Sequence, residues 1–237
     1  MRIRHLLPAL LASTLFLAGC TGSSDSSDAS DDKGGDASAL TARLASAKEA
    51  LDSAETIDIS LATKSLPDGI TGLLSAQGKG NHSPAFKGKV TVITGGSSLG
   101  ADVIAVDGKV YAKTGFAPNF VTIDPKDLKA PDPASLLSTD AGISQILVKT
   151  ESISDGGQSR DGKDVLTTVK GTLPGTVVAT IIPSAASDQT FKVTYRLDDD
   201  DQLRDATLTG QFYPEGGDVT YTVGLATSDT PVTITAP

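Results

Sequence analysis

A two-residue alternation of apolar and polar side chains recurs along most of this chain, and it constrains the fold more than any other feature. Successive side chains of a β-strand point to opposite faces of a sheet, so the alternation predicts strands with one dry face and one wet face. Sheets of that kind are typically antiparallel. The alternating runs are Ile57–Leu61, Phe86–Val92, Val165–Leu173, Phe191–Leu197, Ala206–Phe212, Val219–Leu225 and, closing the chain, Val232 with Ile234.

Turn sequences separate several of these runs. Asp107-Gly108 and the polar segment Asp198–Gln202 are both typical of hairpins. Gly216-Gly217-Asp218 predicts a third hairpin, and Asp161-Gly162 predicts a turn into the strand that begins near Val165. We therefore expect one antiparallel sheet of about nine to eleven strands, and a strongly twisted sheet of that size curls.

Three segments have helical spacing. Apolar residues predict an amphipathic helix over about residues 39–54. Asp132-Pro133 is typical of a helix start, and the apolar face that follows predicts a helix continuing to about Lys149. Residues Thr176–Ile182 are rich in β-branched side chains, which leaves strand or short helix open. Their single apolar stripe favours a helix.

These elements indicate an α+β fold, in which helices cover the concave face of a single curved antiparallel sheet. The space between the layers is either filled by side chains as an ordinary core or left hollow, and periodicity alone favours the filled core. The chain has no Trp and only 4% aromatic residues, which disfavours a carbohydrate-binding face. A wall of Val, Leu, Ile and Ala suits aliphatic chains.

The N-terminus is typical of an exported lipoprotein. Arg2 and Arg4 precede an apolar stretch, Leu6–Ala18, that is too short to span a bilayer, which takes about 20 residues. The string Leu17-Ala18-Gly19-Cys20 resembles the lipobox of bacterial lipoproteins, and Cys20 is the only cysteine. We expect cleavage before Cys20 and a diacylglycerol on its thiol. The alternative is an ordinary signal peptide with a chance cysteine.

The rest of the chain divides into a tether and one domain. Residues 1–19 are the expected signal peptide, and residues 20–38 are rich in Ser, Asp and Gly, which predicts a flexible, lipid-anchored linker. Residues 39–237 form the expected domain. The anchor would hold it on the extracytoplasmic face of the cell membrane, because two or three acyl chains bind a membrane stably. A net charge of −9 disfavours nucleic acid as a partner.

The sequence offers little catalytic chemistry. His82 is the one histidine outside the signal peptide, and it lies beside Ser83 and Pro84 in an expected turn. Gly96-Ser97-Ser98-Leu99-Gly100 matches G-x-S-x-G, but the residues after it predict a strand instead of the helix of a hydrolase elbow. An esterase using Ser98 is a remote alternative. The run Asp198–Asp201 lacks the Gly and Glu of a calcium loop. We expect no catalytic residue, metal or cofactor.

Several short motifs occur in a characteristic order along the chain. They are Gly88-Lys89-Val90, Asp102-Val103, Asp107-Gly108-Lys109-Val110-Tyr111, Asp132-Pro133, Leu136-Leu137, Gly142-Ile143, Ile146-Leu147, Gln202-Leu203 and Pro231-Val232-Thr233-Ile234. With the lipobox and the first helix, their order and spacing resemble the LppX/LprG family (LppX_LprAFG) of mycobacterial and actinobacterial cell-envelope lipoproteins, as far as Pro237. The family often has Trp on the strand that carries Tyr195 in this chain, and Trp at the position of Asn119-Phe120.

The resemblance implies a half-barrel similar to the periplasmic lipoprotein carriers LolA and LolB, with a large hydrophobic cavity. It implies binding of acylated lipids or glycolipids, among them triacylglycerides, and their transport from the cytoplasmic membrane towards the outer envelope. A membrane lipid exporter is a candidate partner. The alternative is a non-catalytic structural or signalling lipoprotein with a closed core.

The expected cavity wall comes from two sources. The resemblance places Val90 on it, and strand parity and helical faces supply the other positions. The full set is Leu44, Leu51, Ile59, Leu61, Val90, Val92, Val103, Leu136, Leu137, Ile143, Ile146, Leu147, Val193, Leu208, Phe212, Tyr221 and Val223.

Overall fold

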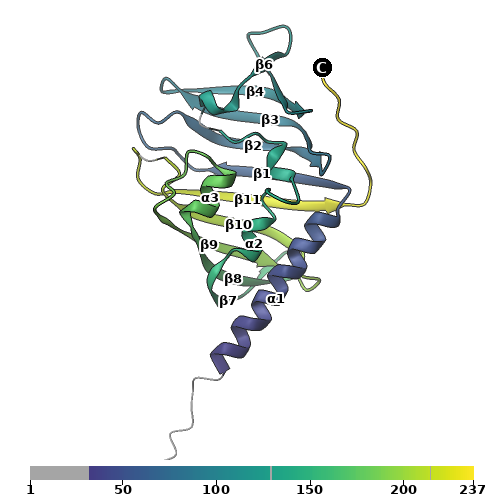
Figure 1. Ribbon diagram of the computed structural model, residues 1–237, viewed down its shortest axis with the longest axis vertical. Helices are drawn as coiled ribbons and strands as arrows, with labels where there is room; N and C mark the ends of the chain where they lie inside the picture. Colours follow the sequence, from purple (N-terminus) through teal and green to yellow (C-terminus); the bar gives the residue numbers. More distant parts are fainter. Residues whose placement is uncertain (1–31, 129, 214) are drawn as a thin grey trace, which may run out of the picture.

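The strands of the computed structural model pair in a single antiparallel sheet (Figure 1). The structure describes residues 32–128, 130–213 and 215–237, so Cys20, the signal peptide and most of the expected tether lie outside the described residues. In this part of the chain the strands are β1 Thr56–Thr63, β2 Gly72–Asn81, β3 Ala85–Thr94, β4 Ser97–Val106, β5 Lys109–Thr114, β6 Val121–Ile123, β7 Glu151–Asp161, β8 Asp164–Pro174, β9 Thr190–Leu197, β10 Leu203–Gly210 and β11 Val219–Ser228.

The spatial order of the strands is β6-β5-β4-β3-β2-β1-β11-β10-β9-β8-β7. The chain builds one half outward from β1 to β6, crosses to the opposite edge at β7, and returns strand by strand until β11 pairs with β1, with Ile59 opposite Leu225. Because β6 and β7 are the two edges, the curved sheet does not close into a barrel. The predicted fold class is confirmed.

Helices lie over one face of this sheet, which we call the inner face (Figure 1). They are α1 Asp32–Ser53 and α3 Gly175–Ile181, together with the connection from β6 to β7. This crossover segment, of which residues 124–128 and 130–150 are described, contains two 3-10 turns, η1 Pro125–Leu128 and η2 Ser135–Leu137, and the short helix α2 Gln145–Val148. Helix α1 packs against α2 and β7, and α3 packs against β8 and β9.

The core forms between the inner face and this cover. Buried residues alternate with more exposed ones along most of β1, β9, β10 and β11, as the pattern predicts. The cover contributes Leu44 and Ala47 of α1, which are fully buried. Phe191 and Tyr221 both meet the ring of Phe212 edge-on, with centroids 4.9 Å apart in each pair. The hairpin prediction at Asp107-Gly108 is confirmed, and both residues have the positive φ that a type I′ turn requires.

The helix predicted from Asp132 to about Lys149 is wrong over most of its length. Asp132 does accept a hydrogen bond from the amide of Ala134, but η2 ends at Leu137 because Ser138 is extended. A Cβ at Gly142 would collide with the Ser138 carbonyl, so the chain makes a tight loop there before α2 begins. The apolar face is therefore shared between two short turns.

Other boundaries also differ from the expectation. Helix α1 begins at Asp32 instead of about residue 39, so residues 32–38 of the expected linker are helical. Extending a helix costs less than starting one, which offsets the weak helix propensity of Gly34 and Gly35. Strands β2 and β7 were not predicted, because neither has a clean alternation. Val232 and Ile234 are outside any strand; Ile234 packs instead beside Ile104, on the outer side of the sheet. The helix predicted at Thr176–Ile182 is confirmed as α3.

Candidate functional site

Two apolar cavities lie between the inner face and its cover. The first, of about 70 Å³, lies under β1–β5 and is lined by Ile59, Leu61, Leu73, Ala76, Phe86, Val90, Val92, Val103, Val110, Ile123, Pro125, Leu128, Ala130, Pro131, Pro133 and Leu136. The second, of about 40 Å³, is lined by Ile59, Leu61, Pro131, Leu136, Ile143, Ile146, Val178, Ile181, Ile182, Leu208, Phe212, Tyr221 and Val223. Since both are lined by Ile59, Leu61, Pro131 and Leu136, they lie side by side across the centre of the sheet.

The crossover segment forms much of the cover above these cavities. Pro125, Pro131 and Pro133 line the first cavity, and proline has no backbone N–H that would need a partner in an apolar space. Leu136 of η2 reaches both cavities. An irregular segment can therefore cover an apolar space without presenting many unpaired donors to it.

The lining carries no charged side chain, and its one hydroxyl belongs to Tyr221. That hydroxyl donates to the Leu73 carbonyl and accepts from the Tyr213 hydroxyl at 2.9 Å, while the Leu73 amide donates to Tyr213 at 3.2 Å. Burial, and then the neighbouring Tyr213, raise the pKa of the Tyr221 phenol above its usual value. The Tyr221 hydroxyl is thus uncharged and already hydrogen-bonded, so the cavities offer a ligand an apolar surface.

A second buried tyrosine fastens the far end of the crossover segment. The Tyr195 hydroxyl lies 2.8 Å from Thr150 Oγ1, which also donates to the Ile146 carbonyl. Burial raises the pKa of the Tyr195 phenol, and the Thr150 hydrogen bond offsets only part of that rise. Tyr195 therefore links the sheet to the end of α2 beside the second cavity.

The structure gathers most of the predicted wall residues at the two cavities. Those that line one or both are Ile59, Leu61, Val90, Val92, Val103, Leu136, Ile143, Ile146, Leu208, Phe212, Tyr221 and Val223. The others are packed in the surrounding core without reaching either space: Leu44, Leu51, Leu137, Leu147 and Val193. Leu44, Leu51 and Leu147 do not reach the cavities because α1 packs directly on α2 and β7.

Sequence reasoning missed several lining residues. Phe86 has the same parity as Val90 on an alternating run, and Val110 occurs in a quoted motif, so a signal existed for both. The residues of the irregular cover left no periodic signal, because a segment with prolines at 125, 131 and 133 has no repeating face. Those missed in the crossover segment are Pro125, Leu128, Ala130, Pro131 and Pro133. Val178, Ile181 and Ile182 were also missed, although the apolar stripe of α3 was a signal for them.

The other sequence motifs have structural positions. Ser98 lies exposed within β4, directly after the Gly95-Gly96 turn, and is not at a strand-to-helix elbow. Asp198 organises the β9–β10 hairpin by accepting from the amides of Asp200 and Gln202. Within the described residues, no group of three or more His, Cys, Asp or Glu is placed to hold a metal ion.

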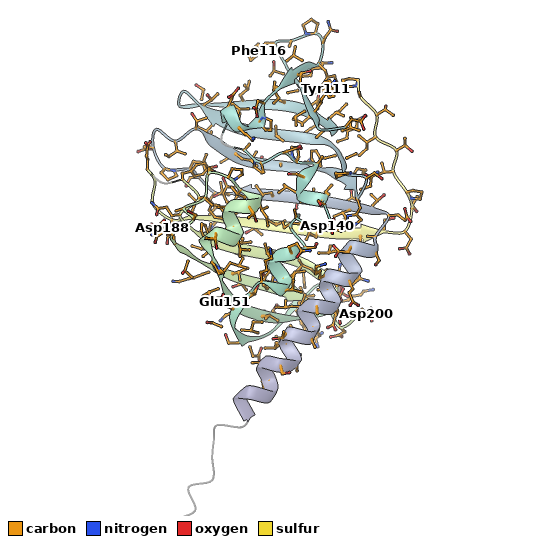
Figure 2. All side chains as sticks on the ribbon, viewed as in Figure 1. Tyr111, Phe116, Asp140, Glu151, Asp188 and Asp200 are labelled. Atoms are coloured by element: carbon orange, nitrogen blue, oxygen red, sulfur yellow. The ribbon has the colours of Figure 1, made fainter. Side chains whose placement is uncertain are left out.

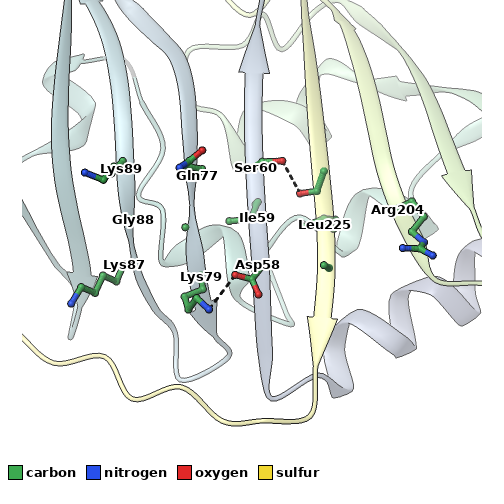
Figure 3. A pocket seen from close by; sticks show the side chains of 13 residues that line it. Asp58, Ile59, Ser60, Gln77, Lys79, Lys87, Gly88, Lys89, Arg204 and Leu225 are labelled. Carbon is green, nitrogen blue, oxygen red and sulfur yellow. Dashed lines mark hydrogen bonds and ion pairs between the residues drawn. The ribbon is translucent and has the colours of Figure 1, made fainter. Parts of the chain in front are cut away.

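The outer face of the sheet carries an open hollow of about 630 Å³ that charged side chains border (Figure 3). Lys79 and Asp58 form an ion pair across β1 and β2 with 3.4 Å between Nζ and Oδ1, and Lys87 and Lys89 lie on the next strand. These side chains are open to solvent. Phe116 is 92% exposed at the tip of the β5–β6 loop, where it points away from the sheet (Figure 2).

A comparison with protein families matches residues 36–234 to the LppX_LprAFG lipoprotein family. The chain belongs to this family. The match covers α1 from residue 36 onward, the whole sheet and the crossover segment, and therefore both cavities. The resemblance inferred from the short motifs is confirmed. Membership indicates a lipoprotein of the cell envelope, which is associated with a membrane.

Solved structures agree on the fold. LprF from Mycobacterium bovis superposes with a TM-score of 0.66 at 16% identity, over 84% of this chain and 97% of that one. LppX from Mycobacterium tuberculosis gives 0.58 at 17% identity, over 84% and 99%. A search of curated proteins by sequence finds no significant match. Of the helices in the described part of the chain, none is both long and apolar enough to cross a membrane.

Proposed function

We propose that this lipoprotein binds acylated lipids or glycolipids, among them triacylglycerides, between the inner face and its cover, and carries them from the cytoplasmic membrane towards the outer envelope. One observation carries the proposal: two adjoining apolar cavities, free of charged lining residues, lie at the centre of the sheet under an irregular cover. A hydrocarbon chain needs nothing else from its binding site.

The energetics favour this kind of ligand. Each methylene group removed from water contributes about 0.8 kcal/mol, so two acyl chains supply ample affinity without a hydrogen bond. The polar head group of the lipid would stay at the mouth of the site, in water. No catalytic residue is required, and we propose that the protein is not an enzyme.

Loading requires the cover to move. Even drug-sized ligands, which are smaller than a diacylated lipid, occupy sites of about 300–1,000 Å³, whereas the two cavities measure about 70 and 40 Å³. The sheet is a continuous hydrogen-bonded structure, and the crossover segment is made of short turns. We therefore assign the opening to the crossover segment, whose displacement would join the two cavities into one.

The anchor and the partners complete the proposal. Acylation of Cys20 would hold the domain on the extracytoplasmic face of the cell membrane, with the residues before α1 as a tether. That arrangement keeps the carrier near the membrane from which it takes lipid. A membrane lipid exporter is the proposed donor of the cargo.

The proposal is tested by filling the first cavity. We expect Val90→Trp to reduce the loading of a pyrene-labelled diacylglycerol at least tenfold while the protein stays folded, because the indole occupies the space. The matched control is Thr91→Trp, since Thr91 is the next residue of β3 and faces the outer side. Equal loading of both variants would show that Val90 does not line the lipid-binding site.

The small volumes favour one rival, a structural or signalling lipoprotein whose core is simply closed. That rival predicts no loading of the pyrene lipid by the unaltered protein at any concentration below its solubility limit. It also predicts that Val90→Trp changes only the free energy of unfolding. The same two measurements therefore separate the two functions.

A further inference from the structure

His82 joins three parts of the fold. It lies in the turn between β2 and β3, and its Nδ1 is 2.6 Å from the carbonyl oxygen of Leu137 in η2. Its Nε2 is 2.9 Å from the carbonyl oxygen of Leu51 in the last turn of α1. One imidazole ring thus connects the sheet, the first helix and the crossover segment.

Both partners of this ring are acceptors. A backbone carbonyl oxygen cannot donate a hydrogen bond, so each ring nitrogen of His82 must carry a proton for both contacts to be hydrogen bonds. Neutral imidazole has one N–H, whereas imidazolium has two. The geometry therefore fits the protonated ring, and loss of its proton leaves a nitrogen lone pair facing a carbonyl lone pair.

The surroundings of His82 favour a positive charge. The carbonyl groups in the last turn of α1 form the negative end of the helix dipole. Asp52 and Glu55 at the end of α1 and Asp107 of the β4–β5 turn line the same hollow as His82. Asp52 Oδ1 is buried without a hydrogen-bond partner among the described residues, while its other oxygen pairs with Lys48.

The remaining neighbours carry no charge. The C-terminal residues 231–236, which line the hollow as well, have no ionisable side chain. Residues 133–139 around η2 have none either. Lys48 is thus the one cation among the groups named here, and it is already paired with Asp52.

The contact to Leu137 bears directly on the cavities. Leu137 packs on Gly80 of β2, where a Cβ would collide with its Cδ1, and the preceding Leu136 lines both cavities. Moving η2 away from the sheet therefore breaks the His82–Leu137 hydrogen bond and opens the space that both cavities share. At the other end, Tyr195 holds α2.

We propose that protonated His82 is a positioning residue that holds η2 closed over the cavities, and that its deprotonation frees the crossover segment for lipid exchange. This inference rests on the proposed function. It predicts slow exchange at acidic pH, where both hydrogen bonds are made, and faster exchange as pH rises. The two conditions to compare are about pH 5 and about pH 8, because imidazolium has two N–H donors and neutral imidazole has one.

The test measures release of the pyrene-labelled diacylglycerol from the mature chain without its acyl groups. We expect the release rate to rise about tenfold between the two pH values, as loss of one hydrogen bond to a charged donor implies. His82→Leu should release quickly at both values. The matched control Ser83→Ala, an exposed neighbour in the same turn, should keep the dependence on pH. A pH-independent rate in the unaltered protein overturns the proposal.

Two further readouts do not depend on lipid binding. Nitrogen NMR of His82 should show both ring nitrogens protonated at about pH 5, and a neutral ring there overturns the proposal even if His82→Leu fails to fold. Hydrogen exchange of the Gly142 and Ile143 amides, which bond back to Ser138 and Leu136, should quicken as His82 deprotonates. If no lipid binds yet this exchange follows His82, the carrier function fails and the positioning role stands.

Discussion

Phe86 lies over Gly78 of the neighbouring strand, so closely that a Cβ at position 78 would be 2.6 Å from its Cζ. Gly88 lies directly opposite Gly78 in the register, and a Cβ at position 88 would be 2.7 Å from the same Cζ. The two glycines thus create the space that an aromatic side chain needs on the inner face, and Phe86 lines the first cavity from that position.

Gly78→Ala should therefore destabilise the protein by about 1–3 kcal/mol, because the added methyl group forces Phe86 and the backbone of β3 to shift. Gly100→Ala is the matched control, since a Cβ at this glycine of β4 meets nothing within 4 Å. The free energy of unfolding from urea titration measures both. Equal stability of the two variants would show that Phe86 does not depend on Gly78.

Core and cavity positions should respond differently to truncation. Leu44 is fully buried in the packing between α1 and the sheet, so Leu44→Ala should cost about 2–5 kcal/mol. Val90 already borders a cavity, so Val90→Ala should lose little more than its two methyl groups, about 1.6 kcal/mol. Urea unfolding measures the difference. A larger loss at Val90 would contradict the distinction between the two sites.

Tyr195→Phe should loosen the end of the crossover segment. The variant keeps the ring in the core but removes the hydroxyl next to Thr150, at a cost of about 1 kcal/mol. Hydrogen exchange of the amides at 146–150 should quicken while exchange in β9–β11 stays slow. Unchanged exchange at 146–150 would mean that α2 is held by packing alone.

Alkaline pH should unfold the protein through its buried tyrosines. Burial raises the folded-state pKa of Tyr195 and Tyr221 above the unfolded value of about 10. The unfolded chain therefore releases these protons first, and stability that is complete below about pH 10 falls as pH rises further. Each tyrosine adds up to about 1.4 kcal/mol per pH unit to this slope. Urea unfolding of Tyr221→Phe above about pH 10 should show a shallower decline than the unaltered protein.

Much of the sheet was predictable because alternation follows directly from one dry and one wet face. That signal found β1, β3 and β8–β11, and the chemistry of Asp107-Gly108 found a hairpin. The alternation did not reveal β2, because glycine has no side chain that would mark an inward-facing position. The inner face of β2 carries Gly78 under Phe86 and Gly80 under Leu137. The alternation also missed β7 because nearly all side chains of that edge strand are exposed.

The candidate site was predicted on its strand side and at Leu136, Ile143 and Ile146 of the crossover segment. Ile59 and Val223 follow from parity and Val90 from the family resemblance, and the structure places all three at the cavities. The cover is irregular, so its proline residues left no period to detect. The contacts of His82 with Leu51 and Leu137 span 31 and 55 residues, and no local pattern encodes such separations. Long-range contacts of this kind arise from the topology of the crossover segment.

The central claim is that the space under the crossover segment holds acyl chains. Native mass spectrometry of the mature chain without its acyl groups, purified from a host that makes the envelope lipids, tests it most directly. We predict an added mass that corresponds to one di- or triacylated lipid, recovered by extraction and absent from Val90→Trp. A bare protein mass from that host, together with no loading of added lipid at any pH, would contradict the account.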